Sequence, residues 1–499
     1  MTRPLLHFAP ERNWMNDPNG LVFHGGRYHL YFQYNPEGAT HGFMSWGHAS
    51  STDLVHWEEH PVAIRYTDTH EMFSGSVVFD EHNSSGLGTV TDPPLVAMFT
   101  LADQRGGHQA QGIASSDDGG LTWRPYEGNP VIDRGSADFR DPKVFRYRGP
   151  AGQYWVMVAV EAMERRVVMY RSDDLRAWTY LSDYGPRGAT GGVWECPDLF
   201  PLAVDGDPAD VRWVLLISLN PGGIAGGSGT QYVLGSFDGV RFVADDPAPP
   251  RAPDRGWENT RAELEACDWL DYGRDCYAGV TFSNLPDEER ILLAWMSNWD
   301  YAGELPVDAE APQRGVMTLA RRLSLVRVAG RVRLRQEPIG PETTPVAVRT
   351  RVPVLERTEL SEELPEQCRI DLCVQLDDAE GFALDLGAAR VEYSAAGGLL
   401  RVDRRPAAST MPHGFGSVEE APIGADEHIE LAIWLDRESI EVFAAGGTRT
   451  ITDLLPEREK AGATIVGRGG SVLVERFEVR AARDLVGTGR AAGMKRRTA

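Results

Sequence analysis

Residues 14–20 read Trp-Met-Asn-Asp-Pro-Asn-Gly, and the interpretation of the whole chain starts from this stretch. Its closing Asn-Gly pair is typical of a tight hairpin turn, and the apolar run at 21–23 that follows is typical of a strand. Taken alone, Asn16 and Asp17 would be interpreted as turn residues, since both side chains bond readily to nearby backbone. Two further acidic clusters downstream make Asp17 a candidate catalytic residue instead.

The composition of the 499-residue chain limits the classes of protein to which it can belong. Apolar residues make up 42% of it, enough for large cores, and the length is typical of two domains. A net charge of −23 disfavours nucleic acid and anionic membranes as partners. No apolar run approaches the ~18 residues of a membrane span, and the first residues lack a secretory-signal pattern. We therefore expect a cytoplasmic protein.

The residues that most often bind cofactors or act as nucleophiles give weak signals. The five cysteines form no C-x-x-C pair, which favours free thiols, and the twelve histidines are scattered along the chain. We therefore predict no metal site and no cofactor. Residues 222–229 are glycine-rich, but no Lys-Ser/Thr follows, so a phosphate loop is not predicted. Cys196 is interpreted as a structural, half-buried thiol rather than a nucleophile.

The first ~335 residues alternate short β-rich runs with Gly, Pro, Asn and Asp turns, which predicts an all-β domain. Five polar clusters recur about 55–80 residues apart, and this repeat favours a five-bladed β-propeller. In a propeller the inner strands of all blades begin near one mouth of the channel, so these clusters should converge. The clusters are at 16–17, 73–75, 140–142, 195–197 and 274–276.

The remainder of the chain predicts a second domain. A Gln-Glu-Pro-Ile-Gly-Pro-Glu stretch from residue 336 is typical of a boundary, and a new series of short strands with glycine turns follows. We predict a catalytic propeller at 1–335, a linker at 336–345, a C-terminal β-sandwich at 346–485 and a disordered tail at 486–499.

Three acids stand in the polar clusters, namely Asp17, Asp141 and Glu195. Cleavage of a glycosidic bond needs two carboxyl groups, so their convergence in one funnel predicts sugar chemistry. Trp194 and Cys196 should give Glu195 an apolar setting that raises its pKa, as suits a general acid. Neighbouring donors should keep Asp17 ionised, and Arg140 should keep the adjacent Asp141 charged. Candidate aromatic walls are Trp14, Trp46, Phe73, Trp194, Trp295 and Trp299.

In their order along the chain, these motifs resemble glycoside hydrolase family 32, which contains invertases, levanases and inulinases. The resemblance extends over essentially the whole chain and is weaker in the C-terminal part. Residues 218–232 resemble the levanase and exo-inulinase branch, whereas 271–275 depart from the usual pattern and leave the outer subsite open. The matching motifs are 14–20, Gln33, Trp46-Gly47, 73–76, 140–142, 194–198 and 295–299.

The resemblance implies a retaining mechanism on β-linked fructose. Asp17 would be the nucleophile that forms a fructosyl-enzyme, and Glu195 would protonate the leaving oxygen and then deprotonate water. Asp141 would stabilise the transition state through fructose hydroxyls. The pocket for the terminal fructose would be lined by Asn16, Gln33, Trp46, Phe73, Ser74, Arg140 and Trp295.

The expected function is that of an exo-β-fructosidase acting on sucrose and on levan or inulin chains, with carbohydrate as its partner. A fructosyltransferase would use the same three acids, so the sequence leaves that alternative open. A related five-bladed family that acts on arabinose or xylose by inversion is disfavoured by the 16–20 motif and the sandwich. A non-catalytic carbohydrate-binding propeller is disfavoured because all three acids are present. The sequence leaves the oligomeric state open.

Overall fold

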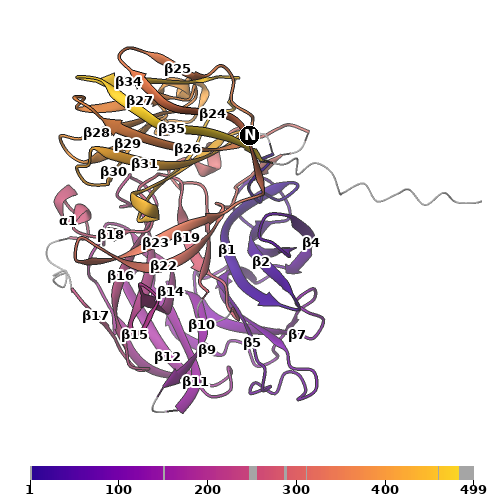
Figure 1. The fold of residues 1–499 in the computed structure, drawn as a ribbon. Helices are drawn as coiled ribbons and strands as arrows, with labels where there is room; N and C mark the ends of the chain where they lie inside the picture. Colours follow the sequence, from indigo (N-terminus) through magenta and orange to yellow (C-terminus); the bar gives the residue numbers. More distant parts are fainter. Residues whose placement is uncertain are drawn as a thin grey trace, which may run out of the picture.

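The computed structural model describes residues 3–149, 152–246, 256–285, 289–310, 312–458 and 460–482, and their regular secondary structure is almost entirely strand (Figure 1). The predicted all-β class is therefore confirmed. The strands of the last third, orange to yellow, form a separate layered body packed against the end of the larger first domain. Within the described ranges, no helix combines the length and the apolarity that crossing a membrane requires. The predicted tail at 486–499 lies outside the described residues.

The first three sheets are antiparallel strands that follow one another along the chain. The first contains β1 (Asn13–His24), β2 (Arg27–Asn35), β3 (Ser45–Ser51) and β4 (Trp57–Ile64), with β21 (Gln313–Arg314) added beside β1. The second contains β5 (His70–Phe79), β6 (Leu95–Asp103), β7 (Gln109–Ser116), β8 (Arg124–Pro125) and β9 (Ile132–Ser136). The third contains β10 (Phe139–Gly149), β11 (Gly152–Glu161), β12 (Arg166–Ser172) and β13 (Thr179–Tyr184).

The fourth sheet has two antiparallel groups, which are joined only where Val204 pairs with Leu325. One group contains β14 (Val193–Val204), β15 (Asp207–Asn220), β16 (Gly229–Phe237) and β17 (Phe242–Ala244), with β18 (Asp268–Trp269) beside β16. The other contains β19 (Tyr277–Thr281), β20 (Ile291–Trp295), β22 (Ala320–Val328) and β23 (Arg331–Ile339). A short helix, α1 (Arg261–Glu265), precedes β18.

The strands β1, β5, β10, β14 and β19 contact one another in cyclic order, with β19 returning to β1. Each of them loses register with its hairpin partner, at the predicted polar cluster in β1, β5, β10 and β14 and just after it in β19. Such a β-bulge breaks the regular alternation of side chains and re-aims them locally. The shifts lie between Met15 and Pro18, Phe73 and Gly75, Arg140 and Lys143, Glu195 and Asp198, and Tyr277 and Val280.

The C-terminal domain is a β-sandwich of two six-stranded sheets. Alternate residues of β26, such as Ile370, Leu372 and Val374, are buried between the sheets, as the period of two requires. One sheet contains β24 (Thr343–Val354), β35 (Val472–Ala482), β26 (Cys368–Leu376), β31 (His428–Asp436), β32 (Ser439–Ala444) and β33 (Arg449–Leu454). The other contains β25 (Thr358–Ser361), β34 (Ala463–Arg468), β27 (Gly381–Asp385), β28 (Arg390–Ser394), β29 (Leu399–Asp403) and β30 (Val418–Pro422).

The stretch between the two domains is shorter than the linker expected at 336–345. Strand β23 continues to Ile339 and β24 begins at Thr343, so only residues 340–342 lie outside strands. The continuation of β23 follows from its pairing with β22, in which Ile339 lies opposite Ala320. Strand β23 therefore includes Pro338, which lies opposite Arg321. Proline has no backbone N–H, so it is tolerated in a strand only where that N–H is not needed for a hydrogen bond to the neighbouring strand.

Two buried arginines join the sandwich to the first domain. Arg321 of β22 donates to Glu441 Oε2 at 2.7 Å and to Asp271 Oδ2 at 3.0 Å. Arg404, which follows β29, donates to Asp275 Oδ2 at 2.7 Å. Both guanidinium groups are inaccessible to solvent. Removing one member of such a pair leaves a buried charge and costs roughly 3–5 kcal/mol, so these contacts hold the domains in one arrangement.

A buried histidine adds a third charged contact at this interface. His7 Nδ1 lies 2.9 Å from Asp436 Oδ2, and its Nε2 lies 2.9 Å from Glu441 Oε1. Burial opposes a charge on the imidazole, but the hydrogen bonds and charges of the two carboxylates outweigh it and raise the pKa of His7 to about 9. The imidazolium is therefore the form present at neutral pH.

We expect His7→Gln to lower the free energy of unfolding by roughly 3 kcal/mol at pH 6 and by progressively less as the pH rises through 9. The raised pKa gives a contribution that is complete below pH 6.5 and lost above about 9. Urea unfolding of both proteins at pH 6, 8 and 10 measures this difference. His56→Gln, at an exposed His–Asp pair, is the matched control and should change little. A His7 effect that does not vary with pH would contradict the assignment.

Candidate active site

Asp17 lies in the bulge of β1, and three donors meet its carboxyl group. Ser74 Oγ donates to Oδ2 at 2.7 Å, Asn16 Nδ2 donates to Oδ1 at 3.0 Å, and Cys196 Sγ lies 3.5 Å from Oδ2. Burial and the charge of Glu195 raise the pKa of Asp17, and these three donors oppose that rise. The predicted donor Asn16 is present, but burial outweighs the donors and the pKa of Asp17 is raised, so the expectation that they keep Asp17 ionised is not borne out.

Asp141 lies in the bulge of β10 with a left-handed φ of 61°. Its Oδ2 accepts a hydrogen bond from the Cys196 backbone N–H at 2.9 Å, and its own N–H donates to Thr100 Oγ1 at 3.0 Å. Burial raises the pKa of Asp141 to about 7 and outweighs the nearby guanidinium of Arg140, which acts in the opposite direction, while Glu195 and Asp17 add to the rise. The expectation that Arg140 keeps Asp141 fully charged is therefore wrong.

Arg140 instead binds Glu195, which is the polar residue of the β14 bulge. Its Nη2 and Nε donate to Glu195 Oε1 at 3.1 and 3.2 Å, whereas its Nε is 4.0 Å from Asp141 Oδ2. The Tyr277 hydroxyl donates to Glu195 Oε2. The predicted apolar setting is wrong, because Trp194 packs into the core with its indole N–H on the Ala189 carbonyl.

Gln33 and Trp46 are buried beneath this cluster. The Trp46 indole N–H donates to the Phe73 carbonyl at 3.0 Å, and Gln33 Nε2 donates to the Met72 carbonyl at 3.0 Å. Both bonds join the first sheet to β5. Phe73 itself is partly exposed and packs against the apolar cluster that contains Trp14 and Trp295.

An aromatic group lies beside the carboxyls. Trp14 and Trp299 are stacked with ring centroids 5.8 Å apart, and Trp295 lies 5.0 Å from Trp299. Trp295 is buried, and its indole N–H has no hydrogen-bond partner within the part of the chain that the structure describes. The edge of His41 faces Trp299 at 5.4 Å. Burial lowers the pKa of His41, although Glu71, Asp17 and Glu195 act in the opposite direction.

Sequence reasoning missed four residues around the carboxyls: Tyr277, Thr100, His41 and Gln109. It also placed the fifth polar cluster at 274–276, which is wrong, because Asp275 binds Arg404 in the domain interface. The residue that β19 brings to Glu195 is Tyr277, directly after that cluster. The repeated spacing of the clusters therefore located β19 to within a few residues. It did not show that Asp275 lies in the domain interface and that Tyr277, at the bulge of β19, is the residue near Glu195.

The two parts of the chain match two family models. One, described as the glycosyl hydrolases family 32 N-terminal domain, matches residues 7–338, and one described as the family 32 C terminal matches 348–481. The chain belongs to glycoside hydrolase family 32. It is thus a glycoside hydrolase, and the resemblance inferred from the motifs is confirmed.

Family 32 relatives match over nearly the whole chain. A levanase of Bacillus subtilis strain 168 is 39% identical over 506 residues, covering 97% of this chain and 71% of that protein. An extracellular exo-inulinase of Aspergillus niger is 37% identical over 520 residues, covering 96% and 94%. The crystal structure of an exo-inulinase from Aspergillus awamori has a TM-score of 0.89 and 34% identity, covering 97% of this chain and 98% of that one.

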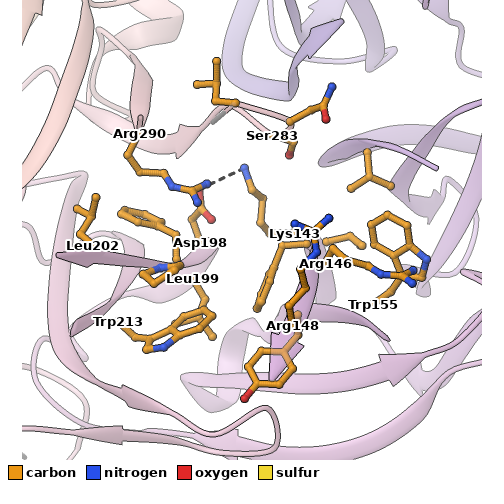
Figure 2. Close-up of a pocket in the computed structure, with 18 of the residues that line it drawn as sticks. Lys143, Arg146, Arg148, Trp155, Asp198, Leu199, Leu202, Trp213, Ser283 and Arg290 are labelled. Atoms are coloured by element: carbon orange, nitrogen blue, oxygen red, sulfur yellow. Dashed lines mark ion pairs between the residues drawn. The ribbon is translucent and has the colours of Figure 1, made fainter. Parts of the chain in front are cut away.

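A cavity of about 640 Å³ lies farther along the same strands of this family 32 chain (Figure 2). At its edge, Lys143 Nζ lies 3.2 Å from Asp198 Oδ2 and also donates to the Thr281 carbonyl. This contact joins β10, β14 and β19 beyond their bulges. Figure 2 shows Arg146 and Trp155 on one side of the cavity and Trp213 on the other. None of the three clustered acids lines it.

We expect Asp141→Asn to raise the free energy of unfolding at pH 8 by on the order of 2 kcal/mol. The pKa of Asp141 is about 7 in the folded protein and 3.8 in the unfolded chain. Its contribution to stability is therefore complete below pH 3.8 and is lost as the pH rises to 7, where the buried carboxyl becomes charged. The gain should therefore vanish toward pH 4. Urea unfolding of both proteins across this range measures it.

Asp53→Asn provides a control of opposite sign. Burial opposes ionisation of Asp53, but hydrogen bonds from His56 and Val55 prevail and lower its pKa to about 2. This variant should be less stable than the wild type above pH 4. Equal effects of the two substitutions at pH 8 would show that the burial of Asp141 does not disfavour its charge.

Proposed function

We propose that the chain is a retaining exo-β-fructosidase that releases terminal fructose from sucrose and from levan- or inulin-type chains. The observation that carries this proposal is the contact network of Asp17, Asp141 and Glu195, which come from three strands. Cys196 reaches both aspartates, through its backbone N–H to Asp141 and its thiol to Asp17. Two carboxyls that meet from different strands are the requirement for glycoside cleavage. The names of the levanase and exo-inulinase relatives support fructans as substrates.

In this mechanism the Asp17 carboxylate attacks the anomeric carbon of fructose while Glu195 gives its proton to the leaving oxygen. The ionised Glu195 then takes a proton from water, which attacks the same carbon and releases Asp17. Asp141 accepts hydrogen bonds from fructose hydroxyls as charge develops on the ring. Arg140 and Tyr277 hold the Glu195 carboxyl in one orientation through both of its oxygens.

The pocket for the terminal fructose is proposed to lie between the acids and the aromatic group. Trp299, the half-buried member of that group, offers an apolar surface to a sugar ring, and the buried Trp14 stacks on it. The full proposed lining is Asn16, Gln33, Trp46, Phe73, Ser74, Arg140 and Trp295.

We propose that the first domain is a five-bladed β-propeller. The cyclic contacts of β1, β5, β10, β14 and β19 support it, as does the division of the nine-stranded sheet into two antiparallel groups. In this arrangement the five bulges face one channel mouth, which explains how residues as distant as Asp17 and Glu195 share a site.

A time course with sucrose, short inulin oligomers and levan tests the proposed activity. Fructose should be the first monosaccharide released from inulin and levan, with each chain shortened one unit at a time. The released fructose should be the β anomer at early times, because two displacements retain configuration. Oligomers longer than the substrate would indicate transfer, and an α anomer would exclude Asp17 as a nucleophile.

Substitution of the acids tests their roles. Glu195→Gln should lower kcat on sucrose by roughly 10²–10⁴-fold, the usual contribution of a general acid, and Asp17→Asn should remove the covalent route altogether. Cys267→Ala is the matched control, since this half-buried thiol donates to the Glu263 carbonyl and contacts none of the three acids. Retained turnover in Asp17→Asn, or its loss in a folded Cys267→Ala protein, would contradict these roles.

A further inference from the structure

A cysteine, a histidine and a glutamate meet on the outer face of the sandwich, far along the chain from the three acids. Cys373 Sγ lies 3.0 Å from His428 Nε2 and 3.2 Å from Glu475 Oε2, and these last two atoms are 2.9 Å apart. In the part of the chain that the structure describes, this is the one group of three His, Cys, Asp or Glu ligand atoms that all lie within 4.8 Å of one another.

The geometry points to a divalent transition-metal site, with zinc as the fitting ion. A thiolate, an imidazole nitrogen and a carboxylate oxygen are the ligands that zinc takes in proteins. Around a tetrahedral zinc, with bonds of about 2.0–2.3 Å, such ligand atoms lie roughly 3.3–3.7 Å apart. Side-chain movements of less than about 1 Å would convert the observed triangle into that arrangement.

The arrangement differs from that of a catalytic thiol relay. In a Cys–His–carboxylate relay, the sulfur and the carboxylate contact opposite nitrogens of the imidazole, so that a proton can pass through the ring. Here both Cys373 and Glu475 approach the same nitrogen, Nε2 of His428. One nitrogen carries at most one proton, so it cannot donate to both neighbours. Three ligand atoms that converge on one point are instead the requirement for binding a cation.

The backbone assembles this triangle from three neighbouring strands. His428 of β31 pairs with Gln375, two residues from Cys373, so their side chains share a face of the sheet. Glu475 of β35 is the extra residue of a bulge, because the register with β26 shifts between Cys373 and Val374. At this bulge the neighbours Glu475 and Arg476 do not alternate between the two faces of the sheet, as they would in a regular strand.

Two further features favour a cation at this position. Glu430 lies directly opposite Cys373 on the same face, so it or a water molecule can complete four-fold coordination. Arg476 is the nearest cationic side chain in sequence, but its guanidinium binds Glu478. With a thiolate and a carboxylate as ligands, a Zn²⁺ ion would be electrically neutralised and would link β26, β31 and β35.

Metal binding by the full-length protein tests the site. Chelator-treated wild-type protein should bind one equivalent of Zn²⁺ in competition with a chromophoric chelator. With Co²⁺ it should develop a thiolate-to-cobalt charge-transfer absorption band. Cys373→Ser should lose this band, and Cys373→Ser and His428→Gln should each weaken Zn²⁺ binding at least ~10-fold, since even outer-shell changes cost that much.

Cys267→Ser is the matched control, because this half-buried thiol donates to the Glu263 carbonyl rather than facing a histidine and a carboxylate. It should keep both the band and the zinc affinity. Sucrose hydrolysis should be unchanged in Cys373→Ser, which shows that the variant is folded. A band that persists in Cys373→Ser, or wild-type zinc binding no tighter than that of this variant, would overturn the proposal.

Discussion

The site depends on holding three carboxyl groups close together in a place where water is largely excluded. Ionised carboxylates that share a low-dielectric site repel one another, and their pKa values rise. Asp17 and Asp141 both show this effect, and each carries the charge of Glu195 among its causes. The surrounding donors limit the effect: Ser74 and Asn16 at Asp17, and the Cys196 backbone at Asp141. The first domain therefore retains an unfavourable arrangement of charge that a more stable protein would avoid.

Backbone bulges and the second domain make this arrangement possible. A regular strand alternates its side chains, so Arg140 and Asp141, as neighbours, could not both face the site without the break in register of β10. The sandwich fixes the position of β19 through Asp275, which lies two residues before that strand. The Asp275 N–H donates to the Thr452 carbonyl, and its carboxylate accepts from Arg404. Two residues later, Tyr277 donates to Glu195. The buried ion pairs between domains thus position a group that touches the proposed acid.

Local sequence chemistry was enough to predict the acids and the all-β class. The turn predicted from Asn19-Gly20 was wrong, because the 14–20 motif lies inside β1, where it causes two register shifts instead of a hairpin turn. The electrostatic partners could not be predicted in the same way. Arg140 donates hydrogen bonds to Glu195, 55 residues away, rather than to the adjacent Asp141. Asp275 pairs with Arg404, 129 residues away. Which charge a flexible guanidinium meets depends on strand register, and a single sequence does not specify that register.

The cluster of Cys373, His428 and Glu475 was missed for the same reason. Metal sites are recognised in sequence when two ligands lie on one turn or one helix face, at spacings of a few residues. Here each of the three side chains comes from a different strand, and one of them lies at a bulge in β35. The three clustered acids are similar in this respect, since each lies at a bulge of its own strand. In a protein made of strands, a bulge is therefore the local feature that can bring side chains from distant parts of the sequence to one point.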